Sequence, residues 1–513
     1  MRTRRSARPA ALIAGVIGAA LVLSACAPEP VSGWKPRQWP VNGAIAPAPP
    51  PPAPEQAPTT DLRLQNDEVG IDARWATLPG TSAFNTAVEA VVRDAVAERA
   101  ALSGTDYRPM AHETGAGLGE RGCMPGATTA PAADLLDGRT GTVVVCEIIL
   151  ARGSFFAERL RTLAAADDAT TTDASTTIYT DVTTGEVRTE AELFADPTTL
   201  WPAYIDTLRR DAGSLSLVPV AEPTDAQLAV LREALLSSHL NDGEVIIPVP
   251  AGLSAVELDG LAAWRERPVQ HPRSVALSAS RAAGALTPFA QALLRAEGDF
   301  VGAPSAGAGF EHIPCDLVPC MALTLDDGPS TLTPGFLDVL RDEQSAATFF
   351  MLGRNAQSFP DTVRRVAAEG HQIGNHTWDH SYLTQLTPEQ VADQLGRTAT
   401  LLRGLSGQPV ATFRPPGGFV DDEVVEVAAE PAILWSVDTR DWEKPADDDL
   451  ARYAIERPNV STIMLMHDIQ AGSARVFDRV VAGLRDRGFA LVTVDALFGG
   501  TVPGGIVRYG PLG

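Results

Sequence analysis

The sequence predicts an α/β protein in which a barrel-like domain of parallel strands and outer helices is preceded by an α+β domain. Short apolar strands alternate with helix-like stretches over roughly 180 residues after Cys320. Strand and helix signals are mixed without such alternation between about Asp61 and Phe300. At 513 residues the chain is also too long for one hydrophobic core, which favours separate domains.

Residues 1–25 have the pattern of an export signal. Arginines at positions 2, 4, 5 and 8 precede an uncharged, mostly apolar run from Pro9 to Leu23, which is short for a membrane span. The run ends in Leu23-Ser24-Ala25-Cys26, which resembles the lipobox of bacterial lipoproteins. The resemblance implies lipidation of Cys26 and anchoring to the outer face of the cytoplasmic membrane. An ordinary secretory signal with an incidental cysteine is the alternative.

Residues 26–60 are predicted to be a tether that follows the lipidated cysteine. The segment is rich in proline and alanine and includes the run Pro49 to Pro52. Such a segment cannot bury a core and favours an extended form. At about 3.1 Å per residue it would reach on the order of 100 Å, from the membrane into a cell-wall layer.

Residues 61–300 are predicted to form the α+β domain. Apolar residues at helical spacing predict a helix from Phe84 to Leu102. Strands are predicted at Thr142–Leu150 and Glu244–Val249, and a hairpin is predicted around the turn Thr183-Thr184-Gly185-Glu186. We find no catalytic constellation in this region.

Cysteine usage agrees with export. If one of the five cysteines is lipidated, an even number remains, as expected for disulfides outside the cytoplasm. We predict the pairs Cys123–Cys146 and Cys315–Cys320. Proximity in the sequence is the only basis for choosing these among the three possible pairings.

Residues 315–500 are predicted to form the barrel-like domain, and residues 501–513 a C-terminal tail. Polar residues follow several of the predicted strands, at the edge where barrels of this kind carry their chemistry. The predicted strands are Met321–Leu325, Ala347–Phe350, Gln372–Gly374, Ile433–Val437, Thr462–Met466 and Ala490–Val494, and the predicted helices are Pro334–Asp342, Asp361–Glu369, Pro388–Leu405 and Ala474–Arg487.

Two polar clusters at predicted strand ends indicate a metal site. Asp326-Asp327-Gly328-Pro329 places two carboxylates side by side, which is costly unless a cation or a specific role stabilises them; a surface turn is the alternative. His376 and His380 lie four apart, a spacing that suits zinc; a solvated pair is the alternative. Thr377 stands where a zinc peptidase of the His-Glu-x-x-His type has its glutamate, which argues against a metallopeptidase.

Three further clusters complete a set of five: Arg414-Pro415-Pro416-Gly417, Asp438-Thr439-Arg440-Asp441-Trp442 and Leu465-Met466-His467-Asp468. Each alone is consistent with a loop, a turn or a strand-end histidine. Together and in this order, the five segments resemble the NodB-type polysaccharide deacetylases, carbohydrate esterase family four. The resemblance covers about Cys320 to Leu497 and implies a deformed (β/α) barrel. Upstream, Asp181 to Val187 and the following Glu192-Leu193-Phe194 resemble domains of multidomain deacetylases and RsiV-like proteins.

The resemblance implies a metal and a general base. Asp327, His376 and His380 would hold a divalent metal, usually zinc, with cobalt or nickel as alternatives. Asp326 would take a proton from the water that the metal activates. Arg414 would lie beside Asp326 and favour its carboxylate form.

The resemblance also implies a general acid and a substrate pocket. His467 would protonate the departing amine, and Asp441 would favour its imidazolium form. The backbone N–H of Gly417 would help to hold the oxyanion. The residues assigned to the pocket are Trp442, Leu465 and Pro416.

Two positions depart from the family pattern. Leu325 stands where many members have phenylalanine, which leaves the position apolar. Gly417-Gly418 stands where many members have an aromatic residue after Arg-x-Pro. We therefore expect the cleft to lose a stacking surface and to gain flexibility there.

The expected function is deacetylation of N-acetylglucosamine or N-acetylmuramic acid in peptidoglycan, by a lipid-anchored protein that extends into the cell wall. Chitin-like oligomers and xylan acetyl esters are alternative substrates. The net charge of −23 argues against nucleic-acid partners. The rival hypothesis is an inactive glycan- or partner-binding lipoprotein, but a vestigial barrel should have lost at least one ligand or catalytic residue.

Overall fold

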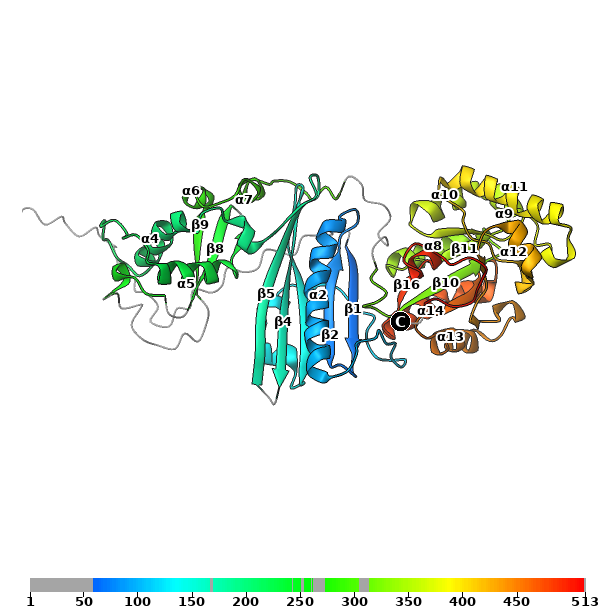
Figure 1. The fold of residues 1–513 in the computed structure, drawn as a ribbon, viewed down its shortest axis with the longest axis horizontal. Coiled ribbons are helices and arrows are strands. Elements are labelled where there is room, and N and C mark those ends of the chain that lie inside the picture. The colour runs from blue at the N-terminus through cyan, green and yellow to red at the C-terminus, as the bar shows by residue number, and fades with distance from the viewer. Residues whose placement is uncertain are drawn as a thin grey trace, which may run out of the picture.

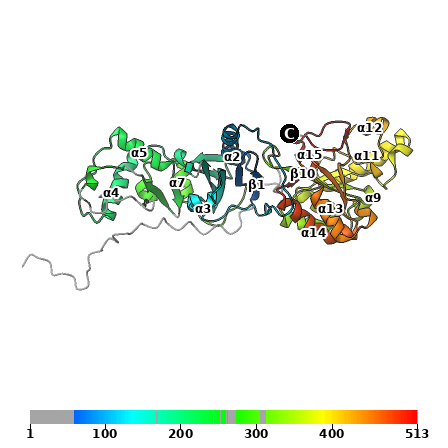
Figure 2. The same ribbon diagram turned by 90° about the horizontal axis from the view of Figure 1, so that it is seen from below.

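The computed structural model describes residues 59–511 except 167–168, 242, 251–252, 260, 262–272 and 304–312. The predicted signal peptide, the lipidation site at Cys26 and nearly all of the predicted tether lie outside the described residues. Figures 1 and 2 show three bodies in a row, with a strand-rich body between a smaller lobe and the barrel. Among the described helices, none has the length and apolar character needed to cross a membrane.

The middle body is a six-stranded sheet, ordered β1-β2-β3-β4-β5-β6, with the long helix α2 (Ser82–Ser103) on one face. Side chains alternate between the faces, so Phe156 and Ile178 belong to the cluster that includes α2, while Phe155 and Tyr179 face the smaller lobe. The predicted helix, the first predicted strand and the hairpin are confirmed. The strands are β1 (Thr60–Asn66), β2 (Ile71–Thr77), β3 (Gly141–Arg152), β4 (Phe155–Ala166), β5 (Ala169–Asp181) and β6 (Glu186–Thr189).

The smaller lobe has its own antiparallel sheet, ordered β7-β8-β9. The region expected as one α+β domain thus contains two sheets, and the lobe packs around a separate hydrophobic cluster that includes Trp201 and Val245. The predicted strand Glu244–Val249 is confirmed as β8. The remaining elements are β7 (His239–Asn241), β9 (Arg273–Ser278), α3 (Ala132–Leu136) in the middle body, and α4 (Trp201–Asp211), α5 (Asp225–Leu235), α6 (Ala279–Ala282) and α7 (Pro288–Leu294) in the lobe.

The barrel is built on parallel strands in the order β12-β11-β10-β15-β14. From β12 the sheet continues through single bridges at Phe413 to β13, which pairs with β17. These short and irregular pairings confirm the predicted deformed barrel. The strands are β10 (Cys320–Asp326), β11 (Thr348–Met351), β12 (Gln372–Asn375), β13 (Ala432–Ile433), β14 (Val437–Asp438), β15 (Ile463–His467), β16 (Ala490–Val492) and β17 (Ile506–Val507).

Two predicted strands differ from the structure. The predicted strand Ile433–Val437 is wrong as a single element, because the carbonyls of Ile433 and Leu434 accept hydrogen bonds from the Arg414 side chain. The predicted strand Ala490–Val494 ends early because Thr493 caps a following helix, accepting from the Ala496 N–H. The expected C-terminal tail contributes β17 to the sheet.

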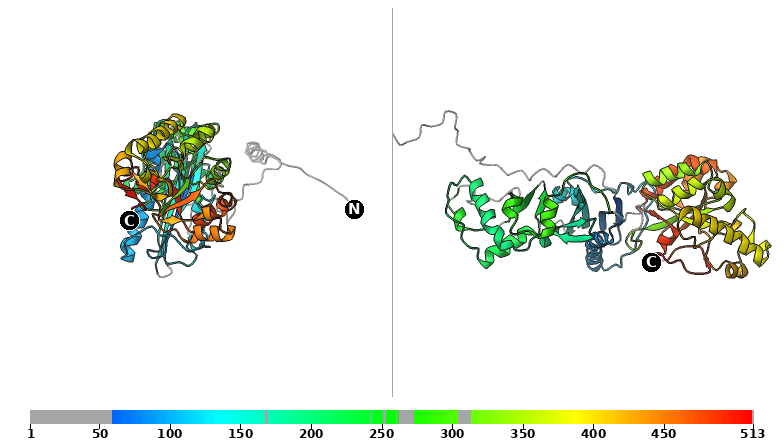
Figure 3. Two further views of the ribbon diagram at one scale, coloured as in Figure 1. Left: turned by 90° about the vertical axis from the view of Figure 1, so that its right-hand side faces the viewer. Right: turned by 90° about the horizontal axis from the view of Figure 1, so that it is seen from above.

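The four predicted helices of the barrel are confirmed as α8 (Thr333–Asp342), α10 (Pro360–Ala368), α11 (Pro388–Ser406) and α14 (Ala471–Asp486). They surround the parallel strands, as the views in Figure 3 show. Four further helices were not expected from the sequence: α9 (Gly353–Ser358), α12 (Asp422–Ala428), α13 (Asp447–Glu456) and α15 (Val494–Leu497).

The middle body and the barrel share a hydrophobic cluster and several buried polar contacts. The cluster includes Trp75 and Leu62 from the middle body with Ile463 and Val494 from the barrel. The buried Arg121 donates to the carbonyls of Arg485 (3.0 Å) and Phe489 (2.7 Å) across the interface. These contacts make one continuous unit of the two bodies.

Both predicted cysteine pairs are joined in the structure. Cys123–Cys146 ties a loop to β3, and Cys315–Cys320 closes the segment that leads into β10. The second disulfide therefore lies at the amino end of the strand whose carboxyl end carries the predicted site.

Candidate active site

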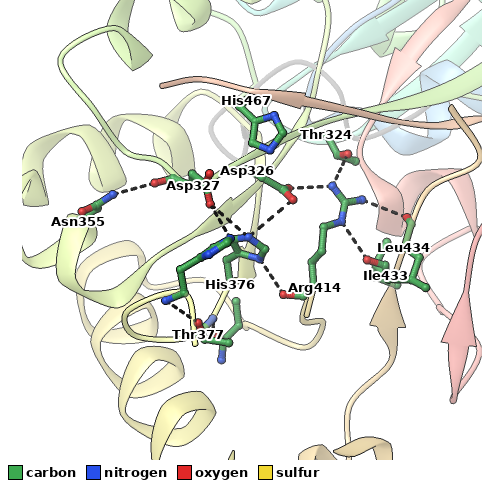
Figure 4. A network of polar contacts seen from close by, with 12 residues as sticks. Thr324, Asp326, Asp327, Asn355, His376, Thr377, Arg414, Ile433, Leu434 and His467 are labelled. Atoms are coloured by element: carbon green, nitrogen blue, oxygen red, sulfur yellow. Dashed lines mark hydrogen bonds and ion pairs between the residues drawn. The ribbon is translucent and has the colours of Figure 1, made fainter. Parts of the chain in front are cut away.

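Two adjacent carboxylates at the carboxyl end of β10 form the centre of the site (Figure 4). Successive side chains of a strand normally point to opposite faces. Asp327, however, has a left-handed backbone conformation with φ of +71°, which ends the strand. As a result both carboxylates approach His376, whose Nε2 lies 3.8 Å from Oδ2 of Asp326 and 3.3 Å from Oδ1 of Asp327.

A fully buried arginine holds Asp326. Nη1 of Arg414 donates to Oδ1 of Asp326 at 2.8 Å and to Oγ1 of Thr324 at 2.6 Å. Its other nitrogens donate to the carbonyls of Ile433 and Leu434. A buried charge is stable only when it is paired and hydrogen-bonded, and both conditions are met here. The ion pair fixes one oxygen of Asp326 and leaves Oδ2 directed toward His376 (Figure 4).

Asp327, His376 and His380 bring three potential metal ligands together. Their ligand atoms lie within 4.8 Å of one another. Oδ1 of Asp327 is 3.3 Å from Nε2 of His376 and 3.4 Å from Nε2 of His380. This oxygen is buried and makes no hydrogen bond of good geometry in the described part of the chain. One carboxylate and two imidazoles are the donor set of many zinc sites.

The hydrogen bond on the far side of His376 supports a cation at this point. Nδ1 of His376 lies 2.7 Å from the carbonyl oxygen of Arg414. A carbonyl can only accept, so Nδ1 carries the hydrogen, and Nε2 of the neutral ring presents a lone pair to Asp327. A lone pair and a carboxylate oxygen repel each other unless a cation lies between them. The residues present therefore fit a divalent metal, with the ring oriented as metal-binding histidines usually are.

The ionisation of Asp327 and His380 also suits a metal. Burial by itself raises the pKa of Asp327, but the proximity of His376 and His380 outweighs burial and lowers the pKa to about 2. Burial and the neighbouring His376 lower the pKa of His380. Metal binding requires an ionised carboxylate at Asp327 and a neutral imidazole at His380, and these two pKa shifts favour both forms near neutral pH.

The turn that carries the two histidines has an unusual backbone. Thr377 and His380 both have positive φ, at 70° and 71°. Such conformations are rare for residues other than glycine and persist where the surroundings enforce them. Here the N–H of Thr377 donates to Oδ1 of Asn375, and the N–H of His380 donates to Oγ1 of Thr377.

His467 lies on β15 directly beside Asp326 in the sheet register. Its Nδ1 is 2.7 Å from Oδ1 of Asp441, and its N–H donates to Oδ2 of the same carboxylate. Ser473 also donates to Asp441, at 2.5 Å. Burial alone would lower the pKa of His467, but the hydrogen bond and charge of Asp441, with the more distant carboxylates, raise it to about 9. His467 is thus held in its protonated form with Nε2 free of Asp441.

The predicted pocket residues differ in exposure. Leu465 and Pro416 are buried, whereas Trp442 is 51% exposed. Gly417 has φ of +64° and is followed by a second left-handed glycine. The expectation that the cleft lacks an aromatic surface at Gly417 is wrong, because the ring of Phe419 folds back to this point.

Several residues of the site were not expected from the sequence. Thr324 accepts from Arg414, Asn355 donates to the backbone carbonyl of Asp327 at 2.7 Å, and Ser473 donates to Asp441. Asp468 is fully buried against Gly328, and Thr333 donates to its carboxylate. Of these residues, only Asp468 lies within one of the five motifs. The others form hydrogen bonds with residues that are distant in the sequence, which no local pattern predicts.

Comparison with known proteins identifies related chains. Residues 315–433 match the family model described as polysaccharide deacetylase. The chain is 39% identical over 180 residues to peptidoglycan-N-acetylglucosamine deacetylase PgdA of Listeria monocytogenes, over 35% of this chain and 39% of the relative's length. It is 34% identical over 186 residues to a peptidoglycan-N-acetylglucosamine deacetylase of Bacillus cereus, over 34% of this chain and 87% of that relative.

A solved structure is also similar. Peptidoglycan deacetylase PdaC from Bacillus subtilis has 34% sequence identity, with 35% of this chain and 89% of that chain covered and a TM-score of 0.34. The chain spans only 39% of the length of the Listeria relative, so the matches concern the barrel and not the whole protein.

Proposed function

Because this chain belongs to the polysaccharide deacetylase family, we propose that it hydrolyses the N-acetyl groups of cell-wall glycan. The observation that carries the proposal is the convergence of Asp327, His376 and His380 beside the ion-paired Asp326 and the protonated His467. Relatives named for N-acetylglucosamine and for N-acetylmuramic acid are both similar to this chain. We propose N-acetylglucosamine of peptidoglycan as the first substrate to test and N-acetylmuramic acid as the second.

Asp327, His376 and His380 would hold the divalent metal, for which we propose zinc, with cobalt or nickel as alternatives. When bound, such an ion lowers the pKa of water and polarises the acetyl carbonyl. The protein's own part is to orient the ligands. The carbonyl of Arg414 fixes the ring of His376, and Asn355 fixes the backbone at Asp327.

Asp326 would act as the general base and His467 as the general acid. The guanidinium of Arg414 binds Oδ1 of Asp326, and Oδ2 is the oxygen left to take a proton from the attacking water. His467 donates a proton to the amine as the C–N bond breaks, and Asp441 orients its ring and favours the imidazolium form. The backbone N–H of Gly417 would stabilise the oxyanion.

The cellular setting is part of the proposal. The pattern that ends in Cys26 supports export and lipid anchoring at the outer face of the cytoplasmic membrane. The proline-rich segment 26–60 would then let the body reach the wall. Labelling of the protein with a radioactive fatty acid would test this, and a Cys26→Ser variant that is labelled equally would contradict it.

Acetate release tests the proposed reaction. We expect the purified protein to release acetate from N-acetylglucosamine oligomers and from peptidoglycan, and to lose this activity when a chelator removes the metal. Asp326→Asn and His376→Ala should abolish release, whereas Asp338→Asn, on the exposed surface of α8, should not. A metal-loaded protein that releases no acetate from either glycan would contradict the proposal.

A further inference from the structure

Two exposed aromatic rings lie beside the predicted metal ligands. The side chains of Tyr382 and Phe419 are 41% and 54% exposed. Their ring centroids are 5.1 Å apart in an edge-to-face arrangement, and the ring of Tyr382 is 6.3 Å from that of His380. Large apolar surfaces that stay exposed at the edge of a catalytic site are typical of binding surfaces. Neither residue has a part in the proton transfers proposed above.

A turn of two prolines and two glycines places Phe419 there. Pro415 and Pro416 have fixed φ, and Gly417 and Gly418 follow with φ of +64° and +73°. The N–H groups of Gly418 and Phe419 donate to the carbonyls of Pro415 (2.9 Å) and Pro416 (3.3 Å). The chain therefore reverses directly after the buried Arg414 and returns the ring of Phe419 over Gly417.

The absence of a side chain at Gly417 makes room for both rings. A Cβ at this position would lie 2.9 Å from two carbons of the Phe419 ring and 3.2 Å from Cε1 of Tyr382. On the other side of the turn, a Cβ at Gly418 would lie 3.0 Å from the ring of Trp435. The rings are thus seated on backbone that is itself packed on Trp435, which limits their movement.

We propose that Tyr382 and Phe419 form a binding platform for the pyranose ring that adjoins the sugar being deacetylated. The inference rests on the proposed function and extends it to the preferred chain length. The faces of N-acetylated pyranoses carry C–H groups and no charge, so the face of an aromatic ring is their natural partner. Aromatic rings bury a large apolar area while losing few rotatable bonds. A substrate with at least two sugars would use the platform, whereas a single sugar would not reach it.

The test compares substrates of two lengths. With metal-loaded protein, we expect Phe419→Ala to raise KM for the N-acetylglucosamine tetramer by about tenfold while kcat changes less than about twofold. In the same variant, kcat/KM for acetate release from the N-acetylglucosamine monomer should be unchanged. Tyr382→Ala should act in the same direction, and Phe419→Trp should restore the wild-type KM. Tyr509→Ala is the matched control, because this ring is 57% exposed and lies by Thr462 at the opposite end of β15.

Two results would overturn the platform. One is an unchanged KM for the tetramer in Phe419→Ala while the wild-type protein releases acetate, which leaves the proposed function intact. The other is an equal loss on monomer and tetramer, which would indicate general damage to the site. If the wild-type protein releases no acetate at all, the proposed function fails. The platform is then tested by calorimetry, which compares the affinity of the tetramer for wild type and for Phe419→Ala. Equal affinity would then overturn it.

Discussion

The protonation of His467 depends mainly on the buried carboxylate of Asp441. The histidine's pKa of about 9 lies above the ordinary value of 6.5 because Asp441, with smaller contributions from Asp326 and Asp327, outweighs burial. The pair therefore stabilises the fold fully below pH 6.5, and this contribution is lost as the pH rises through about 9. The proton needed by a general acid is lost over the same range, so the pair couples stability to the proposed reaction.

We expect Asp441→Asn to move the alkaline limb of the kcat/KM profile to lower pH. Without the negative charge, burial dominates and the imidazolium loses its proton sooner. A bound cation lowers the pKa in both proteins and leaves the sign of the difference unchanged. Ser473→Ala retains the charge and should shift the limb less. Identical alkaline limbs in wild type and Asp441→Asn would argue against His467 as the acid.

Gly328 controls how the turn with Asp327 packs. A Cβ at this position would overlap the carboxylate oxygens of Asp468, which is fully buried and accepts a hydrogen bond from Thr333. We expect Gly328→Ala to displace the turn and to lower zinc affinity at least about tenfold. Competition with a coloured chelator measures this. Gly335→Ala, where a Cβ meets nothing within 4 Å, should keep wild-type affinity, and equal affinities in both variants would contradict the prediction.

At the residue scale, the structure brings together the residues that the sequence predicted as acid, base and metal ligands, because each lies in a motif at a strand end. The sequence did not predict Thr324 or Asn355, whose partners lie 90 and 28 residues away. It also predicted the loss of an aromatic surface at Gly417. Gly417 and Gly418 have left-handed conformations that reverse the chain, so the ring of Phe419 lies over Gly417. The spacing of the motif residues does not predict this reversal.

At the scale of elements, helix α11 positions the turn that carries the histidines. Oε1 of Gln394 accepts from the N–H of Trp378 at 2.8 Å, and its Nε2 donates to Asp379 at 3.0 Å. Asn375 donates to the carbonyl of Leu395 in the same helix. The strained turn is thus tied to a helix of five turns and not only to its own strand.

We expect Gln394→Ala to lower zinc affinity several-fold, because the turn around His380 loses its attachment to α11. Gln390→Ala is the matched control. This glutamine lies on the same helix and belongs to its capping box with Thr387, so its loss should cost about 1 kcal/mol of stability without affecting zinc. Isothermal calorimetry with zinc separates the two. Wild-type affinity in Gln394→Ala would show that the turn holds its shape alone.

Element prediction succeeded where strands and helices were regular and failed where side chains took over backbone hydrogen bonds. The helices α8, α10, α11 and α14 follow apolar periodicity closely. The predicted strand Ile433–Val437 divides because Arg414 binds two of its carbonyls. The pattern of apolar residues in a short segment cannot predict a hydrogen bond from an arginine side chain elsewhere in the sequence.

At the scale of the whole molecule, the barrel packs against the middle body. Their shared cluster includes Leu62, Trp75 and Ile463, and the carboxylate of Asp486 accepts from the N–H groups of Gly115 and Gly117. The sequence of the middle body did not predict this contact, because its apolar residues are equally consistent with the core of an independent domain.

A barrel that begins at residue 313 should therefore be less stable than the longer chain. Removing the middle body exposes the shared apolar cluster and leaves the carbonyls of Arg485 and Phe489 without Arg121. We expect the truncated protein to melt at a lower temperature and to aggregate. Circular dichroism melting and light scattering on both chains measure this.

The point variant Arg121→Ala tests the same interface in the complete chain. Two buried carbonyls lose their donor, which should cost about 2 kcal/mol of unfolding free energy. The matched control is Arg139→Ala, whose side chain is 59% exposed and only 3.9 Å from Asp72, because an exposed pair of this kind contributes little. Urea unfolding followed by tryptophan fluorescence gives both free energies. Two results together would contradict this interface: equal unfolding free energies for Arg121→Ala and Arg139→Ala, and equal melting temperatures for the truncated barrel and the complete chain. The two bodies would then be thermodynamically independent, and the middle body would act only as a spacer or a binding module.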